Sequence, residues 1–272
     1  MSVDISEMAQ YYAKVNISII DVVRVTVPPG RKCFGVYTPP FSGFVFPLRG
    51  RARMFFDGVP YEMEYGKIFH AGPNMSLDKE VLGDSEWDFM VLHYQADDQI
   101  IDKVSYGQAH FELETGSNTR INDLLHRLHK HCATSEPFLA LRVKVLFLEM
   151  MSEILLSANN QSRESGREMV EKAVTYMNMY YMEPLTISQI AAQYGLNNKQ
   201  FTYLFQRHTG IGPTEYLIQQ RIGRARELLC TTRCSVAEIA ACVGYADPYY
   251  FSKLFKKRTG VSPSSFNRRK GQ

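Results

Sequence analysis

Disulfides, membrane spans and long hydrophobic runs are features that this sequence lacks. Its five cysteines are odd in number and form no Cys-x-x-Cys pair, which argues against a disulfide framework or a structural zinc site. No apolar stretch approaches the ~18 residues that a membrane span needs. The first ten residues carry Asp4 and Glu7 and lack the basic and then apolar pattern of a signal peptide. We therefore expect a reduced, cytoplasmic protein with no membrane partner and no cofactor.

The charge is divided unevenly along the chain. The 272 residues are 45% hydrophobic, which is enough for a sizeable core, and the length suggests two domains. Residues 185–272 hold 13 Lys and Arg against 4 Asp and Glu, whereas residues 1–184 hold 18 against 24. A small basic module joined to a mildly acidic one indicates that the C-terminal part binds a polyanion. A solvated basic face without a partner is the alternative.

Residues 17–113 are predicted to form strands. The segments 44–48, 51–56, 61–65, 67–70 and 87–94 are apolar or alternate between apolar and polar residues. Asp57-Gly58 between two of them supplies the positive φ angles of a tight hairpin turn. Many short strands separated by such turns predict a sandwich or a barrel.

After Gly116 the apolar residues recur at helical spacing. Residues 121–132 carry one apolar stripe, and residues 137–157 are apolar nearly all round. A helix without a polar face must be covered on more than one side, so the barrel, the first helix and a second subunit are its candidate covers. Burial wholly within its own domain is the alternative. The polar run 158–166 is predicted to be a linker.

An internal repeat lies in the basic half. Ile190-Ala191-Ala192-x-x-Gly195 recurs 49 residues later as Ile239-Ala240-Ala241-x-x-Gly244. Phe201-x-x-Leu204-Phe205-x-x-x-Thr209-Gly210-Ile211-x-Pro213 recurs 50 residues later, from Phe251 to Pro263. So many matches in order indicate two copies of one structural unit.

Each copy is predicted to be a helix, a tight turn and a second helix. Thr186-x-x-Gln189 and Ser235-x-x-Glu238 are capping boxes that begin the first helices. Gly195 and Gly244 fall where those helices end, in a position that favours a left-handed residue. The second helices are expected at 198–208 and 248–258. This is the helix-turn-helix arrangement, whose second helix enters a DNA major groove; a helical hairpin used only for protein contacts is the alternative.

Residues 185–269 resemble the AraC/XylS family of bacterial transcriptional regulators. The resemblance covers both helix-turn-helix units, about 186–208 and 235–258, the connecting helix 214–231 and the signature from Gly244 to Pro263. Leu48-x-Gly50-x-Ala52, Asp57-Gly58, Tyr65-Gly66 and Pro73 make the N-terminal part similar to the cupin-like domain of that family. The expected α+β chain has a cupin-like sensing domain (1–116), a helical dimerisation segment (117–157), the linker (158–166) and a DNA-binding domain (167–272).

The resemblance assigns residues of both second helices to DNA. Base contacts are expected from Lys199, Thr202, Tyr203, Gln206, Tyr249, Ser252 and Lys253. Phosphate contacts, which set affinity and register without reading sequence, are expected from Arg207, Lys256, Lys257, Arg258, Arg268 and Arg269, with Lys270 beside them. Thr202 and Tyr203 stand where many relatives have a long Arg or Gln, so apolar contact with thymine methyl groups is the expectation there. Arg221 resembles an arginine that pairs within the protein.

The family likeness implies a homodimer, double-stranded DNA as partner and a small-molecule effector in the barrel, and it leaves RNA polymerase open as a further partner. The effector-binding residues are unknown; strand residues weighed for that role are Arg24, Arg49, Arg51, Arg53, Trp87 and Tyr94. The alternative is a cupin-type metalloenzyme or metal sensor fused to a DNA-binding module. His70 and His93 lack the second His that metal cupins place beside the first, and His126, His129 and His131 with Cys132 lack a fixed further ligand. No nucleophile elbow, phosphate-binding glycine loop or zincin motif is present, so no enzyme is expected.

Overall fold

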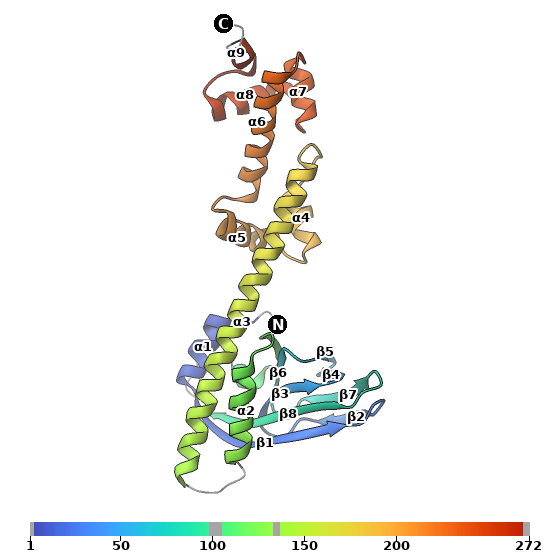
Figure 1. Ribbon diagram of the computed structural model, residues 1–272, viewed down its shortest axis with the longest axis vertical. Coiled ribbons are helices and arrows are strands. Elements are labelled where there is room, and N and C mark those ends of the chain that lie inside the picture. The colour runs from blue at the N-terminus through green and yellow to red at the C-terminus, as the bar shows by residue number, and fades with distance from the viewer. Residues whose placement is uncertain (1–2, 98–104, 133–136, 269–272) are drawn as a thin grey trace. The chain divides into compact units, whose positions relative to one another are not determined.

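The computed structural model describes residues 3–97, 105–132 and 137–268 (Figure 1). The chain divides into two compact units, Met1–Arg163 and Glu164–Gln272. The first unit holds the strands and the second is helical, so the expected α+β class with a helical C-terminal domain is confirmed. In the described part of the chain, no helix combines the length and the apolar character that crossing a membrane requires.

The strands of the first unit form two antiparallel sheets. The larger has the order β1 (Asn16–Val27), β8 (Trp87–Asp97), β3 (Ser42–Arg49), β6 (Lys67–Ala71) and β9 (Phe111–Glu114). The smaller has the order β2 (Lys32–Tyr37), β7 (Ser76–Leu82), β4 (Arg51–Phe56) and β5 (Val59–Met63). The described strands of the two sheets do not pair with each other. The barrel expected from the sequence is therefore two facing sheets and is not closed.

The β4–β5 hairpin forms at the predicted turn. Asp57 has a φ of 49° and Gly58 a φ of 79°, the positive values of a turn that matches the twist of its strands. The Asp57 carboxylate also accepts hydrogen bonds from the backbone N–H and the hydroxyl of Ser76, at 2.9 and 3.2 Å. These bonds tie the turn to the neighbouring strand β7.

The larger sheet is covered on both faces. One face meets the smaller sheet through a core that includes Val45, Phe69 and Phe89. The other face packs against α1 (Ile5–Lys14), α2 (Thr119–Cys132) and the N-terminal part of α3 (Pro137–Tyr180), as Figure 1 shows. Burial on both faces explains why β3 and β8 have nearly continuous apolar sequences instead of an alternating pattern.

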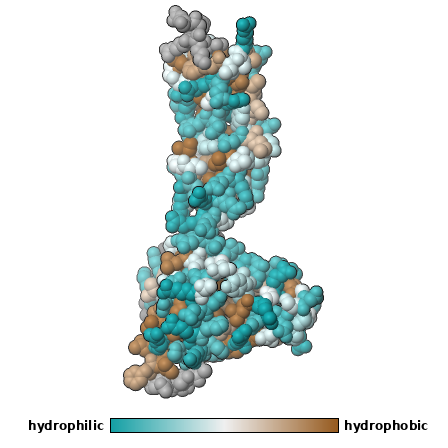
Figure 2. Space-filling view, viewed as in Figure 1, coloured by the Kyte–Doolittle hydropathy of each residue, from teal (hydrophilic) through white to brown (hydrophobic). Residues whose placement is uncertain are grey.

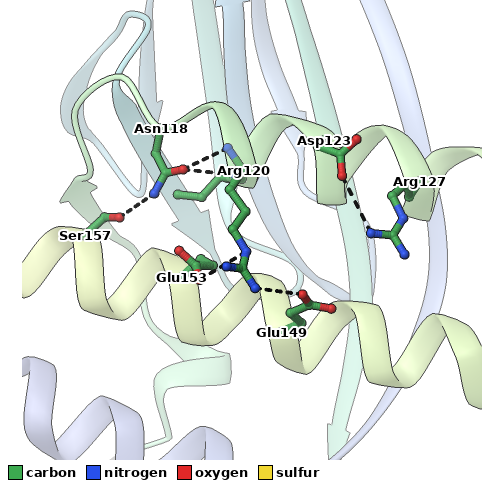
Figure 3. A network of polar contacts seen from close by, with 8 residues as sticks. Asn118, Arg120, Asp123, Arg127, Glu149, Glu153 and Ser157 are labelled. Atoms are coloured by element: carbon green, nitrogen blue, oxygen red, sulfur yellow. Dashed lines mark hydrogen bonds and ion pairs between the residues drawn. The ribbon is translucent and has the colours of Figure 1, made fainter.

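Polar contacts fasten α2 to α3 across the edge of this core (Figure 3). The guanidinium of Arg120 donates to Glu149 at 3.0 Å and forms an ion pair with Glu153 at 3.3 Å. The side-chain amide of Asn118 donates to the hydroxyl of Ser157 at 2.8 Å, and its oxygen accepts from the first backbone N–H groups of α2. Asn118 therefore caps the start of α2 and is also hydrogen-bonded to α3.

The sequence predicted a break between two helices, and the structure has none. α3 continues from Pro137 to Tyr180, through residues 158–166, although the division between the two units falls there. The segment contains no proline, and its Asn and Ser residues weaken a helix only slightly. The predicted DNA-binding domain, 167–272, therefore begins within α3.

The second unit has two hydrophobic cores that share one helix. Its helices are α4 (Ile187–Gln193), α5 (Asn198–Thr209), α6 (Pro213–Thr231), α7 (Val236–Cys242), α8 (Pro248–Thr259) and α9 (Pro263–Arg268). The first core joins the end of α3 to α4 and α5 and includes Leu217 of α6. The second joins α7 and α8 to Ile222 and Leu229 of α6. α6 thus connects two similar helical units.

Candidate nucleic-acid interface

Both helical units begin at the predicted capping boxes. The hydroxyl of Thr186 accepts from the backbone N–H of Gln189, whose side chain accepts from the N–H of Thr186. Ser235 and Glu238 make the same reciprocal pair. Gly195 and Gly244 follow the short helices with φ angles of 66° and 84°, the left-handed conformation that favours glycine.

The second helices, α5 and α8, end in the same geometry. Gly210 and Gly260 both have a φ of 80°. The hydroxyl of Thr209 donates to the carbonyl of Phe205 at 2.8 Å, and that of Thr259 donates to the carbonyl of Phe255 at 2.9 Å. The sequence repeat is therefore a repeat of structure, and corresponding positions of α5 and α8 have the same place on their units.

α5 presents most of its predicted base-reading side chains outward. Phe201 and Phe205 are fully buried and fix which face of the helix points into the protein. On the opposite face Tyr203 is 62% exposed, and Lys199 and Gln206 are exposed as well. Thr202 is only half-buried. The sequence missed that Gln200 takes part in a second capping box, with Asn197, that begins this helix.

α8 carries a stronger basic surface. Tyr249 is 80% exposed at its start, and Lys253, Lys256 and Lys257 are exposed along it. These three lysines form no ion pair with any described residue. Ser252 is half-buried, and its hydroxyl donates to the carbonyl of Pro248 at 2.8 Å. The Ser252 hydroxyl can therefore only accept a hydrogen bond from a base, whereas the exposed Lys253 ammonium can donate one.

The arginines predicted to contact phosphate differ in their surroundings. Arg207 is exposed on α5. Arg258 donates to the carboxylate of Glu215 on α6 at 2.6 Å, a pairing that the sequence did not predict. Arg268 ends α9, while Arg269 and Lys270 lie outside the described residues. The guanidinium of Arg258, which was expected to bind DNA phosphate, thus already donates a hydrogen bond to Glu215.

Arg221 ties the two helical units together, as the family resemblance implied. Its Nε donates to the carbonyl of Tyr181 and its terminal nitrogen to the carbonyl of Glu183, both at 2.7 Å. Its guanidinium also lies over the ring of Tyr245, 5.2 Å from the ring centre. A Cβ at Gly244 would stand 2.9 Å from the Tyr181 carbonyl oxygen, so only glycine allows this close approach.

The strand residues considered as effector contacts are paired or buried, apart from Arg51. Three arginines form ion pairs: Arg24 with Asp88, Arg49 with Glu86, and Arg53 with Glu62. Arg24 holds the pKa of Asp88 below its usual range. Trp87 and Tyr94 are fully buried in the core, and Arg51 is exposed.

His70 and His129 are engaged by the protein. His70 is fully buried: its Nδ1 lies 2.7 Å from the carbonyl of Ala109 and its Nε2 lies 2.8 Å from the hydroxyl of Tyr94. Burial lowers the pKa of His70 to about 4, against the opposing effect of the Ala109 carbonyl. His129 contacts the carbonyl of Val22 at 2.7 Å. Among the described residues, no group of three or more His, Cys, Asp or Glu side chains is arranged to hold a metal.

A cavity that the sequence did not reveal lies between the two sheets. Lys79 of β7 and His93 of β8 line it together with mainly apolar residues. Alternation along β7 places Leu77, Lys79 and Val81 on one face, a signal from which an inward-facing lysine could have been found. A mainly apolar lining with a few polar groups is typical of small-ligand sites.

Comparison with known proteins assigns the C-terminal region. Residues 190–269 match a family model described as Helix-turn-helix domain. The Msm operon regulatory protein of Streptococcus mutans serotype c is 31% identical over 123 residues, covering 45% of this chain and 44% of that protein. The Arabinose operon regulatory protein of Escherichia coli K12 is 31% identical over 128 residues, again covering 45% and 44%. The chain thus matches less than half of the length of these relatives.

A longer sequence match and a solved structure are also similar to parts of this chain. The Lactose operon transcription activator of Staphylococcus xylosus is 24% identical over 229 residues, or 80% of each chain. The DNA-binding domain of AdpA, solved in complex with a target DNA, is 27% identical and covers 37% of this chain and 90% of its own, with a TM-score of 0.36. The repeated helix-turn-helix geometry and the sequence matches show that residues 190–269 form a helix-turn-helix domain of the AraC type.

Proposed function

We propose that the protein is a sequence-specific, DNA-binding transcriptional regulator of the AraC/XylS type that works in the cytoplasm. The observation that carries this proposal is the pair α5 and α8, which have the same glycine C-caps and buried phenylalanines and turn polar and aromatic faces to solvent. Two recognition helices joined by one connecting helix can enter successive major grooves, which are about 34 Å apart. A relative named as a transcription activator favours activation over repression.

The two recognition helices contribute differently to DNA binding. On α8 the exposed Lys253, Lys256 and Lys257 can donate hydrogen bonds to phosphate oxygens and guanine edges. α5 offers Lys199, Gln206 and the exposed ring of Tyr203, which suit base hydrogen bonds and thymine methyl groups. α8 therefore supplies most of the electrostatic affinity, and α5 contributes mainly to the choice of sequence.

Binding to selected DNA over a range of salt concentrations tests this function. Duplexes enriched by the full chain from a random library are measured by fluorescence anisotropy. Each neutralised phosphate contributes roughly −0.9 to the slope of log affinity against log salt, so contacts from Arg207, Lys256 and Lys257 give a slope of about −3 or steeper. A flat slope, or a library without enrichment, would refute DNA as the partner.

The exposed stripe of α3 supports a homodimer. Phe138, Leu141, Val145, Leu148 and Leu156 are 91, 70, 48, 43 and 57% exposed. The first four are separated by three or four residues, the spacing of a helix–helix contact. Figure 2 shows hydrophobic side chains on the surface over the N-terminal end of α3. We propose that a second copy covers this stripe.

We further propose that the N-terminal unit binds a small-molecule effector that gates DNA binding. An effector shifts the balance between DNA-competent and DNA-incompetent states only by its differential affinity for them. The cavity between the sheets supports the proposal. The metal-dependent alternative is not favoured, because the similar proteins are named as operon regulators and a transcription activator. RNA polymerase remains a further candidate partner.

A further inference from the structure

The core of the N-terminal unit leaves a cavity of about 200 Å³ between the two sheets. That volume greatly exceeds the roughly 10–15 Å³ that a single water needs. Thr38, Pro39 and Phe41, in the connection between β2 and β3, form part of its wall. The rest of the wall is mainly apolar and comes from both sheets, including Val25, Val45, Met54, Phe56, Phe89 and Val91.

Lys79 faces this apolar space from the smaller sheet. Its neighbours along β7 are engaged elsewhere: Asp78 accepts from the N–H of Gly35 at 2.7 Å, and Glu80 pairs with Lys32. Lys79 lies opposite Met54 on β4, and it is half-buried. Its ammonium forms no ion pair or hydrogen bond with a described residue.

His93 faces the cavity from the larger sheet. Its Nδ1 lies 2.7 Å from the carboxylate of Asp21. Because an ionised carboxylate only accepts, Nδ1 carries the proton, and Nε2 is left as the other polar atom of the ring. A Cβ at Gly43 would lie 3.2 Å from the His93 ring, so glycine keeps space open beside the imidazole.

The electrostatics of the lining favour an anion. Among the described residues that line the cavity, Lys79 and His93 are the ionisable ones, and no carboxylate is present. A partly desolvated ammonium is stabilised by an opposite charge that hydrogen-bonds to it. The lining offers little to a polyhydroxylated ligand, because the Thr38 hydroxyl already donates to Gly72 and accepts from Met75.

We propose that the cavity binds a small monocarboxylate with an apolar body, whose carboxylate pairs with Lys79 while its hydrocarbon part contacts Met54, Phe56 and Phe89. This assignment rests on the proposed regulator function, because it names the chemical class of the effector. Phe89 belongs to the larger sheet and Met54 and Phe56 belong to the smaller one, so the ligand bridges the two sheets. A bridging ligand stabilises the unit in proportion to its occupancy.

Calorimetric titration of the full chain with two pairs of probes tests the assignment. Hexanoate and benzoate are compared with 1-hexanol and benzyl alcohol, which share their skeletons without the charge. A charge-assisted hydrogen bond to Lys79 gives a preference for the acid of roughly ten- to hundredfold. Failure of both acids to bind, or equal binding of an acid and its alcohol, overturns the assignment.

Three variants locate the binding. Lys79→Met abolishes the preference for the acid, whereas Lys32→Met removes a charge from the outer face of the same sheet and keeps the preference. Val91→Phe fills the cavity without changing its charge and abolishes binding of acid and alcohol alike, while Trp87 fluorescence reports that the unit is folded. A preference that survives Lys79→Met, or binding that survives Val91→Phe, refutes the site.

DNA binding by the same preparation separates this assignment from the proposed function. Intact DNA binding without carboxylate binding overturns the assignment of the cavity and leaves the DNA-binding function standing. Carboxylate binding with the expected variant pattern but without DNA binding supports the cavity and overturns the regulator. Carboxylate binding that changes the affinity for DNA supports both.

Discussion

Arg221, in the middle of α6, donates from Nε to the backbone carbonyl of Tyr181 at 2.7 Å, across 40 residues of sequence. Tyr181 lies just after α3, before the first helix-turn-helix unit, whereas the same guanidinium lies over Tyr245 of the second unit. Each recognition helix is held by its own core. Arg221 therefore adds polar contacts between two cores that also share helix α6 and the side chain of Tyr181.

Replacing Arg221 by alanine is expected to destabilise the C-terminal unit by roughly 1.5–3 kcal/mol, because two carbonyls lose a charged donor. Urea unfolding followed by far-ultraviolet circular dichroism reports this helical unit. The sole tryptophan, Trp87, reports the N-terminal unit, and its unfolding midpoint is expected to stay unchanged. The exposed Arg233 provides the control, since Arg233→Ala is expected to change stability by no more than about 0.5 kcal/mol. Equal effects of the two substitutions would contradict the role given to Arg221.

Lys253 and Lys257 separate base reading from phosphate binding on one helix. Lys253→Ala is expected to weaken binding to the selected site by roughly 1–3 kcal/mol and binding to random DNA far less. Lys257→Ala is expected to weaken both equally and to make the salt slope shallower by about 1. Fluorescence anisotropy on both DNAs measures the two effects. Equal losses for Lys253→Ala would show that Lys253 contacts only phosphate.

Leu141 tests the second copy proposed on α3. Leu141→Glu places a charge in the exposed stripe and is expected to shift a dimer to monomer, because a charge buried at an apolar interface lacks a partner. Val59, an exposed apolar residue at the start of β5, provides the matched control, and Val59→Glu is expected to leave the assembly intact. Sedimentation equilibrium at several concentrations distinguishes the outcomes. A wild-type protein that is monomeric throughout would exclude the stripe as a stable interface.

His70 is expected to make the N-terminal unit sensitive to acid. The pKa of the His70 imidazole is about 4 in the folded protein, against an ordinary value of 6.5. Between pH 6.5 and 4 the unfolded chain therefore binds a proton that the folded chain does not bind. Stability therefore falls as the pH drops from about 6.5 towards 4, by roughly 3 kcal/mol in total. Urea unfolding followed by Trp87 fluorescence at several pH values measures the decline.

The main cause of this acid sensitivity is burial, which disfavours the charged imidazolium, and the hydrogen bond with Tyr94 adds to it. Nδ1 donates to the carbonyl of Ala109, so Nε2 is the acceptor for the Tyr94 hydroxyl, and protonation would replace that acceptor by a second donor. His70→Gln is expected to be less stable at neutral pH and to show a shallower decline between pH 6.5 and 4. An unchanged decline in this variant would assign the acid sensitivity to other groups.

Short-range sequence signals were sufficient to predict most of the helices of the C-terminal unit. Capping boxes, left-handed glycines and buried phenylalanines act within one or two helical turns, so Thr186, Gly195 and Phe201 could be placed without knowing the fold. The same holds for the Asp57-Gly58 hairpin. The division between the two units falls within the linker predicted at 158–166. The segment is nevertheless helical, because polar composition alone does not end a helix that contains no proline.

The sequence by itself determined the two helix-turn-helix units, the strand-rich first unit and the residues that face outward from α5 and α8, because these follow from periodicity and short-range capping. Only the tertiary structure decided that Glu215 engages Arg258, that Arg221 binds the carbonyls of Tyr181 and Glu183, and that Lys79 and His93 face one cavity. Each of these relationships joins side chains from elements far apart in the chain. Pairings of that kind depend on how whole elements pack, which no local pattern of residues encodes.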